Sequence, residues 1–138
     1  MLVGRSRLDG SSPLENLTIL LIEDDESMRT LVGRMLSRLK TKVIAAENGP
    51  GGLQALDAAT QPVDLIICDW NMPGMSGMEV FEQVRARRPG LPFLMLTGRA
   101  DLESVVAAKK AGIAGYIVKP VSQPELQTKL SFLARKSA

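Results

Sequence analysis

Five short apolar runs divide the chain, and segments with apolar residues at helical spacing lie between them. The runs predict strands at about 18–22, 42–45, 65–68, 93–96 and 116–118. Nearly continuous apolar runs of this length are typical of parallel strands that are buried on both faces. Strands that alternate with helices predict an α/β fold, with a doubly wound, five-stranded parallel sheet joined by right-handed crossovers.

The helical segments differ in how clearly their sequences mark them. The first carries one face of apolar residues: Met28, Leu31, Val32, Met35, Leu36 and Leu39. The second is expected near 53–59, because the glycine- and proline-rich segment 49–52 disfavours a helix until its end. The fourth is marked by Leu102, Val105 and Val106.

Capping boxes predict where the third and fifth helices begin. Ser76 and Glu79 have the spacing at which a hydroxyl and a carboxylate exchange hydrogen bonds with the first helical turn. Ser122 and Glu125 repeat that spacing. The residues expected to face the core after these caps are Val80, Phe81, Val84, Leu126, Leu130 and Leu133.

Polar residues stand where four of the apolar runs end. They are Glu23, Asp24 and Asp25 after the first run, Asp69 after the third, Thr97 after the fourth and Lys119 after the fifth. If the ends of the first and third strands meet, their carboxylates repel by about 1 kcal/mol per pair at 4 Å in water. Such a cluster needs a cation, and oxygen ligands favour a hard one such as Mg²⁺. The acids, hydroxyl and lysine together outline an anionic metal site that receives a phosphoryl group.

Each of these residues also has an ordinary structural interpretation. Asp69 precedes an Asn-Met-Pro-Gly segment, so it could be a turn residue. Glu23 and Asp24 could be acids stabilised by a helix dipole, although the dipole accounts for one acid better than for three together. Thr97 could owe its place to β-propensity. Lys119 could be a solvated surface lysine, but its position between a buried strand and a proline weakens that interpretation.

Composition excludes several classes of function. The chain of 138 residues suggests one domain, expected at 17–138 after a flexible tail at 1–16. A net charge of +2 is too small to argue for nucleic acid or membrane binding, and no apolar stretch is long enough to span a bilayer. The single cysteine fits a reducing cytoplasm. Because the chain has no histidine, it cannot itself be a phosphohistidine carrier.

Four motifs occur in order along the chain: residues 21–25, residues 69–77 (Asp-Trp-Asn-Met-Pro-Gly-Met-Ser-Gly), residues 96–98 (Leu-Thr-Gly) and residues 115–120 (Gly-Tyr-Ile-Val-Lys-Pro). From about Leu17 to Leu133, the chain resembles the receiver domain of two-component response regulators. The resemblance is strongest to the single-domain chemotaxis type, CheY-like. It implies a flavodoxin-like (βα)5 fold with strand order 2-1-3-4-5.

The resemblance also implies roles for the polar residues. Asp69 would be the phosphoacceptor. Asp24 would bind Mg²⁺ directly, Glu23 through water and Asn71 through its backbone carbonyl. The Thr97 hydroxyl and the Lys119 ammonium would contact the phosphoryl group, and the Lys119–Pro120 peptide would be cis.

One position departs from the family pattern. Arg99 stands two residues after Thr97, where the chemotaxis relative has an acid. Because Arg99 and Asn71 would flank the phosphoryl group, both would tune its hydrolysis. The resemblance therefore does not imply how long the phosphorylated state of this chain lasts. The expected output surface, coupled to Thr97, consists of Ala100, Leu102, Val105, Tyr116, Val118 and Lys129.

The expected function is that of a stand-alone, monomeric response regulator in the cytoplasm. It would accept a phosphoryl group from a sensor histidine kinase and switch a surface that a downstream protein reads, without being an enzyme in its own right. One alternative is a phosphorelay intermediate that passes the group to a histidine phosphotransferase. Another is an aspartate-dependent phosphohydrolase, although such enzymes carry a second acid where this chain has Asn71. A degenerate receiver that acts as a scaffold is disfavoured, because every expected site residue is present.

Overall fold

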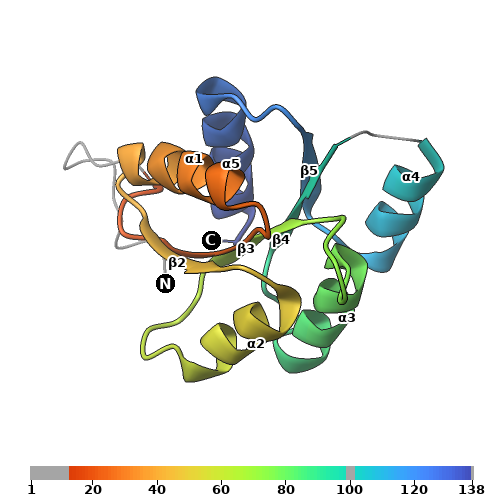
Figure 1. Cartoon of the computed structure of the whole chain (residues 1–138). Coiled ribbons are helices and arrows are strands. Elements are labelled where there is room, and N and C mark those ends of the chain that lie inside the picture. The colour runs from red at the N-terminus through yellow and green to blue at the C-terminus, as the bar shows by residue number, and fades with distance from the viewer. Residues whose placement is uncertain (1–12, 99–101, 138) are drawn as a thin grey trace.

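Five parallel strands form the sheet of the structure, a computed structural model that describes residues 13–98 and 102–137. The strands are β1 (Thr18–Ile22), β2 (Lys42–Ala46), β3 (Leu65–Asp69), β4 (Phe93–Thr97) and β5 (Gly115–Val118). They lie in the order β2-β1-β3-β4-β5, and each adjacent pair is parallel (Figure 1). The doubly wound α/β fold and the strand order 2-1-3-4-5 are therefore confirmed.

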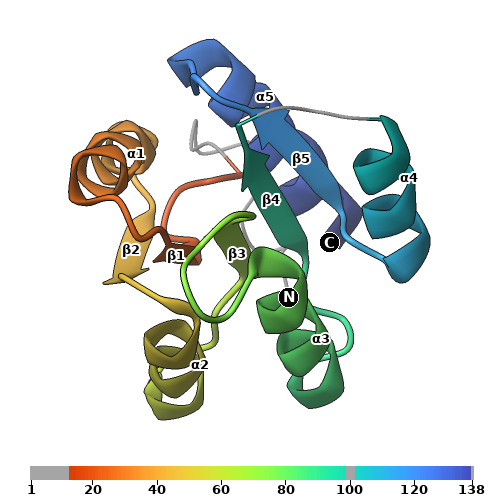
Figure 2. The same cartoon turned by 45° about the vertical axis from the view of Figure 1, so that its right-hand side comes forward.

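The helices cover both faces of this sheet. They are α1 (Glu26–Arg38), α2 (Gly49–Ala58), α3 (Gly77–Arg87), α4 (Leu102–Ala111) and α5 (Gln123–Ser137). Helices α1 and α5 pack on one face, and α2 and α3 pack on the other, as two views of the molecule show (Figures 1 and 2). Helix α4 lies beside β5 and contributes its buried Ala108 to the α2 and α3 side.

The three central strands are buried because their side chains supply the cores on both faces of the sheet. Every residue of β1, β3 and β4 is buried. In β1, Ile19 and Leu21 join the core under α1 and α5, whereas Leu20 and Ile22 join the core under α2 and α3. This alternation explains why the central strands appear in the sequence as unbroken apolar runs.

Helix α2 begins at Gly49, so the expectation that it begins near Leu53 is wrong. Asn48 caps the helix, because its side-chain oxygen accepts a 2.7 Å hydrogen bond from the Gly51 amide. Proline is tolerated in a first turn, where its missing N–H would have no helical partner. A glycine is needed at position 52, because a Cβ there would lie 2.7 Å from Cγ1 of the buried Ile22.

The core face of α1 is narrower than the sequence suggested. Val32 and Leu36 are buried, but Leu31 is 45% exposed, so its assignment to the inward face is wrong. At 3.6 residues per turn, Leu31 is rotated by about 100° from Val32, which turns it out of the core. The core positions expected on α3 and α5 are all buried, and Ser76 and Glu79 make both hydrogen bonds of the predicted capping box. Ser122 accepts a 3.3 Å bond from the Glu125 amide.

Packed structure begins before residue 17. Leu14 is buried in the core, and the Asn16 amide donates a 2.8 Å hydrogen bond to the Lys40 carbonyl. The tail predicted at 1–16 therefore includes residues that are packed. Residues 1–12 lie outside the described part of the chain. Within the described residues, no helix has the length and apolar character needed to cross a membrane.

A pair of glycine substitutions tests the packing of α2 against the sheet. We expect Gly52→Ala to lower the free energy of unfolding by about 1–3 kcal/mol, because the added methyl group must displace Ile22 from a filled core. Gly33→Ala in α1 is the control, since a Cβ there meets no atom within 4 Å. It should raise the free energy of unfolding by roughly 0.5–1 kcal/mol, as expected for alanine replacing glycine inside a helix. Urea unfolding measures both, and equal stabilisation by the two variants would contradict the close packing at Gly52.

Candidate functional site

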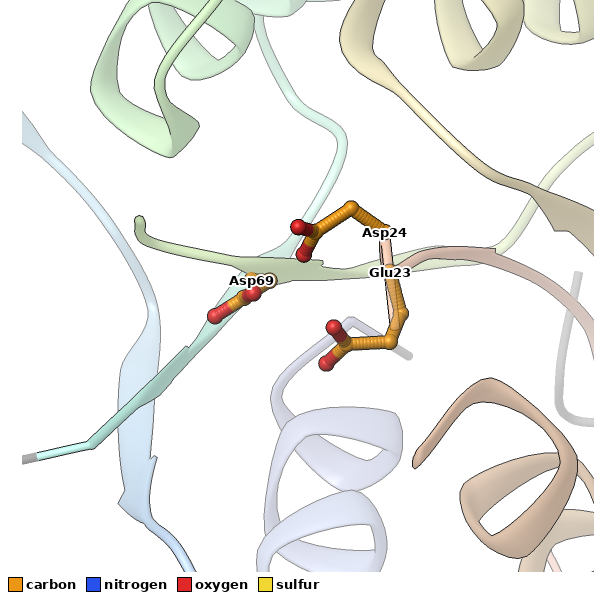
Figure 3. A group of neighbouring side chains, drawn as sticks. All are labelled: Glu23, Asp24 and Asp69. Carbon is orange, nitrogen blue, oxygen red and sulfur yellow. The ribbon is translucent and has the colours of Figure 1, made fainter. Parts of the chain in front are cut away.

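Three carboxylates gather at the carboxyl end of the sheet. Glu23 and Asp24 directly follow β1, and Asp69 is the last residue of β3. Their ligand oxygens all lie within 4.8 Å of one another, with the Glu23 and Asp24 side chains both turned toward Asp69 (Figure 3). The strand register explains this meeting, because Ile22 of β1 pairs with Cys68 of β3. The acids separated in the sequence therefore form one cluster.

The three acids differ in their exposure to solvent. Glu23 is fully buried, Asp69 is 5% exposed, and Asp24 is exposed. The cluster is therefore open on the Asp24 side and closed beneath Glu23. Solvent therefore meets the cluster at Asp24, whereas Glu23 is closed off from it.

Lys119 contacts the two buried acids from the end of the edge strand β5. It follows β5, and its amide donates a 2.7 Å hydrogen bond to the Thr97 carbonyl at the end of β4. Its Nζ donates to Oδ1 of Asp69 at 3.1 Å and forms an ion pair at 3.1 Å with Oε1 of Glu23. The Lys119–Pro120 peptide is cis, as the family resemblance implies.

Burial and crowding change the proton affinities of these groups. Burial raises the pKa of Glu23 to about 7; a hydrogen bond from the Asp25 amide opposes this rise, and the charge of Asp69 adds to it. Burial also raises the pKa of Asp69, as does its contact with Asp24, against the opposing effect of Lys119. Burial alone would lower the pKa of Lys119, but its bonds to Glu23 and Asp69 outweigh burial and raise it.

The charges of the cluster suit a divalent cation. Lys119 supplies one positive charge, which is fewer than the negative charges that three carboxylates can carry. The donors are all carboxylate oxygens, the ligand type that hard cations such as Mg²⁺ prefer. The residues present therefore fit a hard divalent metal ion.

The segment after β3 is held close to the site. The Trp70 amide donates to the Leu96 carbonyl, and the Gly77 amide donates to the Trp70 carbonyl, both at 2.8 Å. A Cβ at Gly77 would lie 2.5 Å from the backbone oxygen of Asp69, so only glycine fits there without moving the strand end. Asn71 lies in this segment and is exposed.

The structure brings together Glu23, Asp24, Asp69 and Lys119 and places Thr97 nearby. Thr97 is the last residue of β4 and is 3% exposed. Its register partner is Val118, and β4 lies between β3 and β5. Thr97 is therefore a near neighbour of the acids and of Lys119. Arg99 lies outside the described residues.

The residues expected to form the output surface are only partly described. Val105, Tyr116 and Val118 are half-buried, and Leu102 begins α4. The Lys129 ammonium lies 5.4 Å from the centre of the Tyr116 ring. Ala100 lies outside the described residues.

The sequence interpretation missed one residue next to the site. Nη1 of Arg29, in the first turn of α1, donates a 2.8 Å hydrogen bond to the Glu23 carbonyl. A basic residue in a first turn is unusual, because the helix dipole disfavours a cation there. That conflict is the signal from which Arg29 could have been found.

Comparisons with known proteins agree with this geometry. A family model described as the response regulator receiver domain matches residues 19–131. Chemotaxis protein CheY-3 of Vibrio cholerae is 36% identical over 119 residues, covering 84% of this chain and 90% of that protein. The transcriptional regulatory protein GlrR of Escherichia coli is 32% identical over 87% of this chain, which corresponds to 27% of that longer protein.

Solved structures give the same result. A structure of Vibrio cholerae chemotaxis protein CheY4 has a TM-score of 0.80 and 31% identity, and covers 86% of this chain and 98% of its own. A response regulator receiver domain protein from Clostridium thermocellum has a TM-score of 0.77 at 26% identity, covering 88% and 93% of the two chains. These matches agree with the expected flavodoxin-like fold and the CheY-like type. The chain belongs to the response regulator receiver domain family of two-component systems.

Proposed function

We propose that this receiver accepts a phosphoryl group on Asp69 from a phosphohistidine of a sensor kinase, with Mg²⁺ bound beside it. The observation that carries the proposal is the buried Asp69 carboxylate, bonded to Lys119 at 3.1 Å and open to solvent on the side of Asp24. Asp24 and Asp69 would bind the metal directly, Glu23 through water, and Asn71 through its backbone carbonyl. When bound, Mg²⁺ supplies positive charge to the carboxylates and the phosphoryl oxygens.

The transfer would proceed by in-line displacement. A carboxylate oxygen of Asp69 forms the new bond to phosphorus, while the bond from phosphorus to the donor histidine nitrogen breaks and leaves its electron pair on that nitrogen. Lys119 then follows the negative charge from the carboxylate to a phosphoryl oxygen, as a mobile single-point cation can do. The Thr97 hydroxyl donates to another phosphoryl oxygen.

Other features of the site favour a receiver over a phosphohydrolase. The position at which aspartate-dependent phosphohydrolases carry their second acid is held by the exposed Asn71, which cannot act as a general acid. We therefore propose self-phosphorylation and slow self-dephosphorylation in place of turnover of a separate substrate, with Asn71 and Arg99 tuning the loss of phosphate. We place this activity in a monomeric protein of the cytoplasm.

Phosphorylation would be read on the surface formed by α4, β5 and α5. Met95 and Tyr116 pair across β4 and β5, and Thr97 lies two residues beyond Met95 on the same face. An inward movement of Thr97 toward the phosphoryl group would vacate space that the Tyr116 ring can fill. The Lys129 ammonium lies 5.4 Å from the centre of that ring, so this contact would break if the ring turned inward. A downstream protein that prefers one arrangement would then sense the phosphorylation.

The first prediction concerns the acceptor. Incubation with a small phosphodonor and Mg²⁺ should add one acid-stable, base-labile phosphoryl group, measured by mass spectrometry. Asp69→Ala should not acquire it, because no other acid ends β3 beside Lys119. Asp57→Ala is the control, since Asp57 is exposed on α2 and pairs with Arg87 at 3.3 Å. Phosphorylation of Asp69→Ala at the wild-type rate would show that the acceptor lies elsewhere.

The second prediction concerns the metal. Trp70 is the chain's single tryptophan and directly follows Asp69, so its emission should change as Mg²⁺ is titrated. Asp24→Ala should abolish this change and should also raise the metal-free stability by up to about 1 kcal/mol, because it relieves repulsion among the acids. Glu82→Ala, at an exposed position on α3, should do neither. Undiminished Mg²⁺ affinity of Asp24→Ala would rule out Asp24 as a direct ligand.

The third prediction concerns the output surface. NMR shifts with and without a phosphoryl analogue at Asp69 should change at Thr97, Tyr116 and Lys129, as well as around the acids. The Lys129→Met variant should keep the changes at Thr97 and lose part of the difference at Tyr116, because its cation no longer favours the outer ring position. If the changes stay within the loops after β1 and β3, the signal does not reach this surface.

A further inference from the structure

The turn between β1 and α1 is held by a small set of hydrogen bonds. The Asp25 amide donates to Oε2 of Glu23 at 3.1 Å, and the Ser27 amide donates to Oδ1 of Asp25 at 3.2 Å. Arg29 completes the set through the 2.8 Å bond from its Nη1 to the Glu23 carbonyl. Asp24, the exposed acid of the cluster, lies in the middle of this turn.

The charge of Arg29 is unfavourable for the helix and for a bound metal. It stands in the first turn of α1, where the helix dipole repels a cation, and beside the acid cluster it would repel a divalent metal held there. A residue that conflicts with its local environment is expected where function compensates for the cost. The compensation visible here is the hydrogen bond to Glu23, which a neutral side chain without an N–H donor could not make.

That hydrogen bond fixes the peptide that joins two members of the acid cluster. The Glu23 amide already donates to the Ala46 carbonyl at 3.0 Å, which anchors one side of Glu23 to β2. The Glu23 carbonyl belongs to the planar peptide unit that leads to the Cα of Asp24. When Arg29 holds this carbonyl, it sets the plane of that peptide and therefore the direction in which the Asp24 side chain leaves the backbone.

We infer that Arg29 is a positioning residue, which keeps the Glu23 and Asp24 carboxylates turned toward Asp69 by holding the Glu23–Asp24 peptide. Its effect on the metal rests on the proposed function, in which Asp24 binds Mg²⁺ directly. Its effect on the turn does not, because the donors and acceptors of these hydrogen bonds all belong to the chain itself. The two effects can therefore be measured separately.

A positioning role and a simple charge effect predict opposite changes in Mg²⁺ affinity when Arg29 is removed. If Arg29 acted only as a nearby positive charge, its removal would reduce repulsion and tighten Mg²⁺ binding. If it positions the ligands, its removal must weaken binding despite the lost repulsion. Partners that orient metal ligands typically contribute a factor of about 10–100 to affinity.

The first experiment compares Mg²⁺ titrations of the wild-type chain, Arg29→Met and Arg34→Met, followed by Trp70 emission. Arg34 is the matched control, since it lies on the same helix and is exposed. We expect the Kd of Arg29→Met to rise about tenfold and that of Arg34→Met to stay within about twofold of wild type. Unchanged or tighter binding by Arg29→Met would overturn the inference.

The second experiment uses the metal-free protein. Backbone NMR order parameters should fall at the Asp24 and Asp25 amides in Arg29→Met, and should stay at their wild-type values in Arg34→Met. Equal order parameters in all three proteins would overturn the inference. If the wild-type chain binds no Mg²⁺, the proposed function fails, while this measurement still decides whether Arg29 holds the turn.

Discussion

Lys119 contributes one ammonium to two buried carboxylates, and the arrangement of the carboxyl end of the sheet depends on this shared contact. Its Nζ lies 3.1 Å from both Glu23 and Asp69. Removing a charge from water costs several kcal/mol, so two acids can stay buried side by side only with such a partner. The partner is incomplete, because one cation cannot satisfy the whole cluster. The negative charge that remains is what suits the cluster to a further cation.

The uncompensated negative charge also explains why several contacts hold the backbone around the acids. Like charges that repel would move apart if the strand ends could yield. Glu23 is anchored to β2 by its amide, the Trp70 amide bonds to the end of β4, and Gly77 packs directly on the Asp69 backbone. These contacts hold the acids together at a cost in stability, as is common for sites that are organised before their ligand arrives.

Much of the fold could be predicted because it follows from local rules. Strands covered on both faces must be apolar along their length, and Ser76 with Glu79 forms the expected cap. The carboxylate cluster was equally predictable, since parallel strands bring their ends to one edge. The start of α2 was not, because it depends on the Asn48 cap and on the space beside Ile22. Arg29 was missed because its partner is a backbone carbonyl, which the sequence cannot name; the only signal was a basic residue in a first helical turn.

The position of Lys119 in the sequence determines when the acid cluster gains its counter-charge. The lysine and Asp69 are 50 residues apart, with α3, β4, α4 and β5 between them along the chain. Closing a loop of this length costs chain entropy, which the contact between its ends must offset. A chain whose synthesis has not yet reached residue 119 has the three acids but lacks the Lys119 ammonium. The acid cluster therefore has its counter-charge only once all five strands have been made.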